Sequence, residues 1–185
     1  MKKILSACAV AAAFVAAPAF AQGYIGGGFG SSRVSGFDFS NVSGGNVNKG
    51  LVKIYGGYQF TPNWGLEAQY ADLGNRNITQ AGASVGSFKS SQISLAGTGT
   101  LPLSSGFSLL GKLGVTGNRS TGSGGIVING TSSQALIGVG VGYNFSPALS
   151  ARFEYEDFGR LFTLGNNGNS SVRANGYSLS LKYAF

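Results

Sequence analysis

The last nine residues of the chain, Tyr177-Ser178-Leu179-Ser180-Leu181-Lys182-Tyr183-Ala184-Phe185, decide the fold. Aromatic residues or leucine occupy the odd positions, and serine, lysine or alanine occupy the even positions. Successive side chains of a β-strand point to opposite faces, so the segment predicts a strand with one apolar and one polar face. It stops on an aromatic residue with no polar tail, which favours an apolar face that points into lipid over one that lines the core of a soluble sheet.

The beginning of the chain has the pattern of a secretory signal peptide. Lys2 and Lys3 precede an apolar stretch from Ile4 to Ala16, and Ala19-Phe20-Ala21 is a small-x-small cleavage site. We expect residues 1–21 to be removed after export, which leaves residues 22–185 as a single domain.

Composition narrows the way in which this domain could be stabilised. The only cysteine, Cys8, lies in the leader, so no disulfide is expected. After the leader, no apolar run approaches the roughly 20 residues that a transmembrane helix needs. An exported chain with 13 phenylalanines, 8 tyrosines and no helical span leaves a closed β-barrel as its membrane option.

Period-two alternation recurs along the domain and predicts strands rather than helices. In one of them Val52 and Ile54 alternate with Lys53 and Tyr55, so a large apolar face opposes a polar one. Elsewhere the polar face is mostly glycine and serine, which suits the narrow lumen of a small barrel; a soluble lipocalin-like barrel would put its large apolar residues inside. The predicted strands are 23–31, 51–60, 64–72, 88–101, 107–116, 134–145, 149–158 and 177–185.

The connections between these strands alternate between long and short. Each short turn contains one of the prolines Pro62, Pro102 and Pro147, where the missing N–H costs no ladder bond. Long loops at one end and tight turns at the other are typical of outer-membrane barrels. We therefore predict an all-β, eight-stranded antiparallel up-and-down transmembrane β-barrel, monomeric, in the outer membrane. The predicted long loops are 32–48, 74–86, 117–131 and 159–171.

Aromatic residues gather near both ends of the predicted strands, as expected for girdles at the two membrane interfaces. Ordinary strand aromatics are the alternative interpretation. Beside the short turns lie Phe60, Trp64, Phe107, Phe145 and Phe185, and beside the long loops lie Phe29, Tyr70, Phe88, Tyr155 and Phe158.

Three segments resemble the OmpA transmembrane-barrel family. Residues 61–74 (TPNWGLEAQYADLG) are similar to its second turn and third strand, and residues 146–155 (SPALSARFEY) to its third turn and seventh strand. Residues 178–185 resemble its closing strand with the terminal aromatic. We expect no peptidoglycan-binding domain of the kind that often follows the barrel, so that the chain resembles the barrel-only OmpX and opacity-protein relatives more closely.

The resemblance implies partners in biogenesis and charges inside the barrel. The closing strand is the signal that the outer-membrane assembly machinery reads, and periplasmic chaperones would escort the chain to it. Glu67 and Arg152 fall on the positions of a lumenal charged pair of the family, whereas Thr98 and Gly142 stand at its second pair. The assembly signal comprises Tyr177, Leu179, Leu181, Tyr183 and Phe185.

Further charged residues share the inward parity of Glu67 and Arg152. An isolated buried charge is very unfavourable, so four bases and three acids in one lumen must neutralise one another. We expect a charge network that plugs the barrel. Its predicted members are Lys53, Glu67, Lys112, Arg152, Glu154, Glu156 and Lys182.

The sequence gives little support to catalysis. The chain has no histidine, whereas the deacylase, palmitoyltransferase and protease barrels of the outer membrane each work through one. Glu154 and Glu156 lie beside Arg152, which fits the plug better than acid–base chemistry. The glycine-rich segments 26–30 and 138–142 are followed by no helix, so they keep the interior open and bind no nucleotide. We expect no enzyme activity, cofactor, metal or nucleic-acid partner.

Seven bases lie in or beside the long loops, opposed only by Asp38, Asp72 and Asp157. We hypothesise that they contact lipopolysaccharide phosphates in the outer leaflet; a solvated basic rim is the alternative. These bases are Arg33, Lys49, Arg76, Lys89, Arg119, Arg160 and Arg173.

Three roles fit such a chain. The first is a structural barrel that supports envelope integrity and presents surface loops. A small diffusion pore is an alternative, although eight strands leave little room for solute. A surface adhesin that acts through Ser/Gly/Asn-rich loops such as 35–48 is another.

Overall fold

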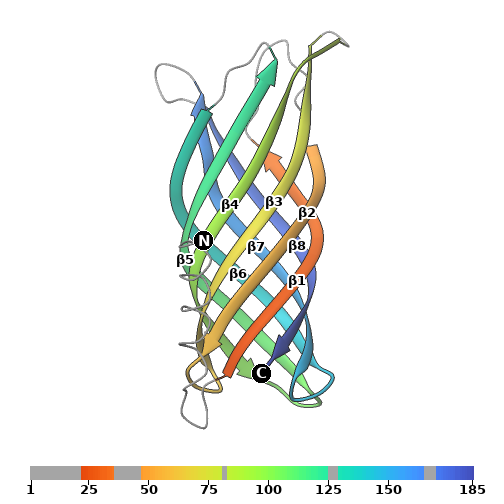
Figure 1. Cartoon of the computed structure of the whole chain (residues 1–185), viewed down its shortest axis with the longest axis vertical. Helices are drawn as coiled ribbons and strands as arrows, with labels where there is room; N and C mark the ends of the chain where they lie inside the picture. The colour runs from red at the N-terminus through yellow and green to blue at the C-terminus, as the bar shows by residue number, and fades with distance from the viewer. Residues whose placement is uncertain (1–21, 36–46, 81–82, 125–128, 165–169) are drawn as a thin grey trace, which may run out of the picture.

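The computed structural model describes residues 22–35, 47–80, 83–124, 129–164 and 170–185. Its eight strands pair in chain order into one closed antiparallel barrel (Figure 1). They are β1 (Gln22–Ser35), β2 (Val47–Gln59), β3 (Trp64–Gln80), β4 (Ala83–Pro102), β5 (Phe107–Gly124), β6 (Asn129–Asn144), β7 (Leu149–Leu164) and β8 (Ser170–Ala184). None of the described residues forms a helix that is long and apolar enough to cross a membrane. The predicted fold is confirmed; the expected signal peptide, residues 1–21, lies outside the described residues.

The closing strand completes the barrel as its alternation predicted. β8 pairs with β7 on one side and with β1 on the other, so that Leu179 stands opposite both Phe153 and Phe29. In the part of the barrel near the short turns, each described strand is paired on both sides, which satisfies the backbone hydrogen bonds that lipid could not.

The barrel is apolar outside and polar inside. On β2 the side chains of Val52 and Ile54 are 60% and 62% exposed, whereas those of Lys53 and Tyr55 are 1% and 4% exposed. The same alternation runs along the other strands through the residues predicted to face outward. Acyl chains can solvate such a surface, whereas water would not.

The strands continue through most of the segments that we predicted as long loops, so those loop boundaries were wrong. β3 and β4 stay paired as far as Gln80 and Ala83, and β5 reaches Gly124. Backbone pairing needs no apolar alternation, and beyond the bilayer neither face of a hairpin requires it. The side-chain pattern therefore ends before the strands do.

Two matching bulges mark this change on β3 and β7. The register shifts between Asp72 and Asn75, and again after Asp157. In each case an aspartate Oδ1 accepts a hydrogen bond from a glycine two residues later, at 2.9 Å from Gly74 and 2.8 Å from Gly159. Both glycines have positive φ angles, 81° and 68°, which favour glycine.

Most of the predicted girdle residues lie on the outer surface. All five beside the short turns are exposed, as are Phe29, Tyr70 and Tyr155 at the other end. Phe158 is the exception: its side chain is fully buried, because it has the inward parity of the β7 glutamates. The side chain of Phe88 lies outside the described residues. The proline prediction also needs one change, since Pro102 is the last residue of β4.

Candidate functional site: the charged lumen

The polar faces of four strands bring six charged side chains together inside the barrel. Three are cations and three are carboxylates, and each side chain is at most 6% exposed. We call this set the charge network: Lys53 on β2, Glu67 on β3, Lys112 on β5, and Arg152, Glu154 and Glu156 on β7.

Each lysine of the charge network serves more than one carboxylate. Lys53 Nζ lies 2.7 Å from Glu154 Oε2 and 2.8 Å from Glu156 Oε2. Lys112 Nζ lies 2.6 Å from Glu67 Oε1, 2.8 Å from Glu154 Oε1 and 3.1 Å from Glu156 Oε1. Arg152 Nη1 donates to Glu67 Oε2 at 2.8 Å. With three charges of each sign, the network is neutral as a whole.

Two buried tyrosines and a glutamine complete it. Tyr24 donates its hydroxyl to Glu67 Oε2 at 3.0 Å, and Lys112 donates to Gln69 Oε1 at 3.3 Å. The Tyr55 ring lies under three cations, with its centroid 5.3 Å from Arg152 Cζ, 5.6 Å from Lys112 Nζ and 5.7 Å from Lys53 Nζ. We had not included these three residues in the site, although their inward parity could have indicated them.

Glycines face the largest members of this assembly. A Cβ on Gly138 would lie 3.3 Å from both Glu156 Cγ and Lys112 Cβ, and one on Gly26 would overlap the Tyr55 ring. Replacing hydrogen with any side chain at these positions would displace the groups that close the lumen.

Lys182 does not join the charge network, contrary to our prediction. Among the described residues it forms no ion pair, and its Nζ lies over the Tyr24 ring, 5.1 Å from the centroid. Its parity is inward, but it lies near the short-turn end of β8, opposite Ser150. The acids lie further along the barrel.

A layer of apolar side chains lies on the long-hairpin side of the charge network. Its members are all at most 1% exposed, and sequence reasoning did not place them there. A Cβ on Gly176 would lie 3.3 Å from Leu51 Cδ1 and 3.5 Å from Phe158 Cε2, so both side chains reach over that glycine. We call Leu51, Leu73, Leu136 and Phe158 the apolar layer.

The bases expected at the long loops occupy the strand ends away from the short turns. Two of them are ion-paired, with 3.2 Å between Lys89 Nζ and Asp72 and 3.6 Å between Arg173 Nη2 and Asp157. Arg160 and Arg173 stand opposite each other on β7 and β8 and line an outer groove of about 350 Å³ with Ile137. Exposed members are Arg33, Lys49, Lys89, Arg119, Arg160 and Arg173; the side chain of Arg76 lies outside the described residues.

The residues expected to form the assembly signal all face outward on β8 or just after it. Tyr177, Leu179, Leu181, Tyr183 and Phe185 are 49–64% exposed. Among the described residues there is no group of three or more histidine, cysteine, aspartate or glutamate side chains arranged to hold a metal ion.

This architecture, with a lipid-facing exterior and a charged interior, defines the class of eight-stranded outer-membrane barrels. Residues 5–185 match the family model of the outer membrane protein beta-barrel domain, and the chain belongs to that family. The family places it in the outer membrane. No curated protein sequence matches it significantly.

Solved structures of similar barrels support the same fold. Ail, the attachment invasion locus protein of Yersinia pestis, solved in complex with the heparin analogue sucrose octasulfate, is 20% identical with a TM-score of 0.59, over 90% of this chain and 99% of Ail. Neisserial surface protein A is 18% identical with a TM-score of 0.61, over 88% and 97%. OprG from Pseudomonas aeruginosa is 16% identical with a TM-score of 0.58, over 90% and 97%.

Proposed function

We propose that this protein is a structural barrel of the outer membrane that supports envelope integrity and presents its long hairpins at the cell surface. The observation that carries the proposal is the charge network, whose six side chains are buried and paired across the lumen. A diffusion pore needs a continuous water path through the lumen. The charge network closes that path, and separating buried ion pairs to open it is strongly unfavourable.

The apolar layer supports the same conclusion independently. Leu51 and Phe158 lie between the charge network and the long hairpins, so a solute would have to pass buried apolar side chains as well as the charged ones. A hydrophobic constriction opposes ion passage because ions lose hydration there.

Single-channel recording in a planar bilayer tests this proposal against the pore. The wild-type barrel should give no regular opening events. A variant can open the lumen by replacing Lys53, Lys112, Glu154 and Glu156 with serine, which keeps the net charge. With Phe158→Ala added to reduce the apolar layer, this variant should conduct more than the wild-type barrel. Regular openings in the wild-type protein would overturn the proposal in favour of the pore.

Cell experiments address the structural role and its location. A deletion strain should become more sensitive to detergent, and the wild-type gene should restore resistance. Heat-modifiable gel mobility and protease shaving of intact cells report the folded barrel and the surface exposure of the long hairpins. Removal of residues 1–21 during export, delivery by periplasmic chaperones and recognition of β8 by the assembly machinery belong to the same proposal.

A second candidate function is polyanion binding at the long-hairpin rim. Arg160 and Arg173 flank an outer groove that also exposes Ile137, which suits a lipid phosphate above an acyl chain. Ail was solved with a sulfated heparin analogue. For this chain we favour lipopolysaccharide phosphates; host-surface binding through 35–48 is the adhesin alternative, and residues 36–46 lie outside the described ones.

Binding to lipopolysaccharide vesicles tests this candidate. The double variant Arg160→Gln/Arg173→Gln should bind more weakly than wild type, and so should a triple glutamine variant at Arg33, Arg76 and Arg119. Tyr183→Phe changes an outward side chain near the opposite end and serves as the control. Unchanged binding in both rim variants would refute this candidate and would favour the alternative, a solvated basic rim.

A further inference from the structure

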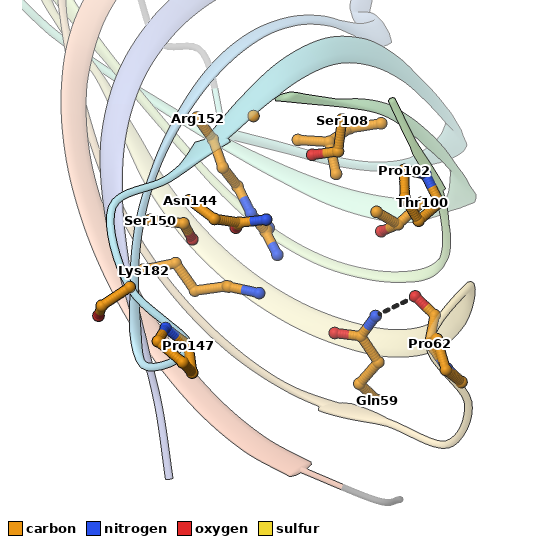
Figure 2. A pocket seen from close by; sticks show the side chains of 13 residues that line it. Gln59, Pro62, Thr100, Pro102, Ser108, Asn144, Pro147, Ser150, Arg152 and Lys182 are labelled. Atoms are coloured by element: carbon orange, nitrogen blue, oxygen red, sulfur yellow. Dashed lines mark hydrogen bonds between the residues drawn. The ribbon is translucent and has the colours of Figure 1, made fainter. Parts of the chain in front are cut away.

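A polar cavity of about 290 Å³ opens at the short-turn end of the barrel, on the other side of the charge network from the apolar layer. Figure 2 shows the side chains of Asn144, Arg152 and Lys182 pointing into it from β6, β7 and β8. Pro62 and Pro147 of the short turns lie at its rim. We call this space the short-turn cavity.

The charge facing the short-turn cavity is positive. Its lining contains Arg152 and Lys182 and no aspartate or glutamate. The charge network above the cavity is neutral and has no excess negative charge to offset Lys182. Lys182 itself forms no ion pair with any described residue. Arg152 donates one hydrogen bond within the network, from Nη1 to Glu67. A guanidinium carries five N–H donors, which leaves others for a ligand on the cavity side.

A buried hydroxyl in the same lining lacks a partner. Ser150 is 4% exposed, and its Oγ forms no hydrogen bond with any described residue. It stands directly opposite Lys182 on the neighbouring strand, which places the two side chains on one face at adjacent positions. A buried polar group normally has a hydrogen-bond partner, so a cavity-bound acceptor would account for this one.

We propose that the short-turn cavity is a binding site for a small oxyanion, a phosphate or carboxylate group that enters from the side of the short turns. Lys182 and Arg152 supply the positive charge, and the Ser150 hydroxyl and Asn144 amide donate further hydrogen bonds. An oxyanion with several lone pairs can accept from all of these groups at once, and charge-assisted bonds are the stronger ones. The cavity exceeds by several-fold the roughly 30 Å³ share of one water molecule, so such a group fits together with solvent. The site does not depend on the structural role or the rim function proposed above.

An NMR titration of the isotope-labelled mature protein in detergent micelles tests the site. Sodium phosphate and sodium acetate are added in separate arms at constant ionic strength, with sodium chloride as the balancing salt. We expect saturable shifts confined to the Ser150, Arg152 and Lys182 signals in at least one arm. The stronger arm identifies whether the group recognised is a phosphate or a carboxylate.

Matched variants connect these shifts to the cavity. Lys182→Gln should weaken binding about tenfold or more, because it removes a charge-assisted bond. Lys182→Arg should retain binding, and Ser150→Ala should weaken it less than Lys182→Gln. Ser178→Ala removes a buried hydroxyl on the same strand that does not line the short-turn cavity, and it should bind as wild type. Heat-modifiable mobility confirms that each variant is folded.

Three results would overturn the proposal. One is the absence of saturable shifts in both wild-type arms, which needs no variant to fold. Another is equal affinity in Lys182→Gln and wild type. The last is a matching response to sodium chloride alone, which would mean screening of a diffuse positive field.

Discussion

Lys112 on β5 reaches past β4 to place its Nζ 2.6 Å from Oε1 of Glu67 on β3. Both side chains are at most 3% exposed. Glu67 also pairs with Arg152, so the Lys112–Glu67 pair links two groups of charges into one network. Removing one member of a buried ion pair leaves its partner uncompensated, whereas removing a neutral pair does not. The stability of the barrel should therefore depend on the balance of lumenal charge.

Lys112→Met should be strongly destabilising. It leaves three buried carboxylates with two cations, and breaking a buried pair in this way costs about 3–5 kcal/mol. Urea unfolding in lipid vesicles, followed by the fluorescence of Trp64, the single tryptophan, measures the loss.

Two comparisons separate charge balance from loss of the lysine itself. Lys89→Met removes a 62% exposed side chain from its pair with Asp72 and should cost at most about 1 kcal/mol. In Lys112→Met/Glu156→Gln the charge network is neutral again, so this double variant should be more stable than Lys112→Met alone. Equal losses in the single and double variants would refute the charge-balance explanation.

Gly26→Ala should destabilise the barrel by about 1–3 kcal/mol, the usual range for overpacking. The new Cβ would overlap the Tyr55 ring, which cannot move freely because its hydroxyl bonds Ser180 Oγ at 3.1 Å. The same unfolding assay applies. Gly27→Ala is the matched control, since its Cβ would point outward and lie 3.5 Å from the nearest atom, the Lys53 carbonyl. Similar losses at both positions would mean that strand propensity, rather than lumenal packing, sets the cost.

Tyr24→Phe tests the tyrosines that complete the charge network. The change keeps the ring but deletes the hydroxyl that donates to Glu67 Oε2 at 3.0 Å. Because a buried carboxylate loses a hydrogen-bond donor, the substitution should lower the free energy of unfolding by about 1–3 kcal/mol, measured by the same urea unfolding. Tyr183→Phe, at a 53% exposed outward position, should change stability little. A larger effect at Tyr183 than at Tyr24 would contradict the assignment.

The face of each strand could be predicted because a period of two ties position in sequence to side of the sheet. Lys53 and Tyr55 were both placed inward by this rule, and both are buried. Pairing of the network charges followed from the cost of burying them alone. Most of the barrel wall and the charged part of its lumen could therefore be predicted from the sequence.

The position of each side chain along the barrel axis could not be predicted from the sequence. Parity gives the face of the sheet, and it says nothing of how far along the axis a residue lies. Lys182 has the right parity but stands opposite Ser150 near the short turns, away from the acids. Register between neighbouring strands decides these positions, and it depends on pairings that no single strand encodes.

Phe158→Ala should destabilise the barrel by about 3–5 kcal/mol, because it would leave a cavity in the apolar layer. Its side chain is fully buried and lies, like that of Leu51, over Gly176. Phe153→Ala, on the same strand but 48% exposed to lipid, should cost less, since fluid acyl chains fill the space. Urea unfolding compares the two variants directly. If Phe153 proved the more costly position, the apolar layer would not be a packed element of the lumen. In the intact apolar layer, Leu51→Ala combined with Phe158→Ala should cost less than the sum of the two single losses, because both side chains pack over Gly176 and losses at neighbouring sites are not additive.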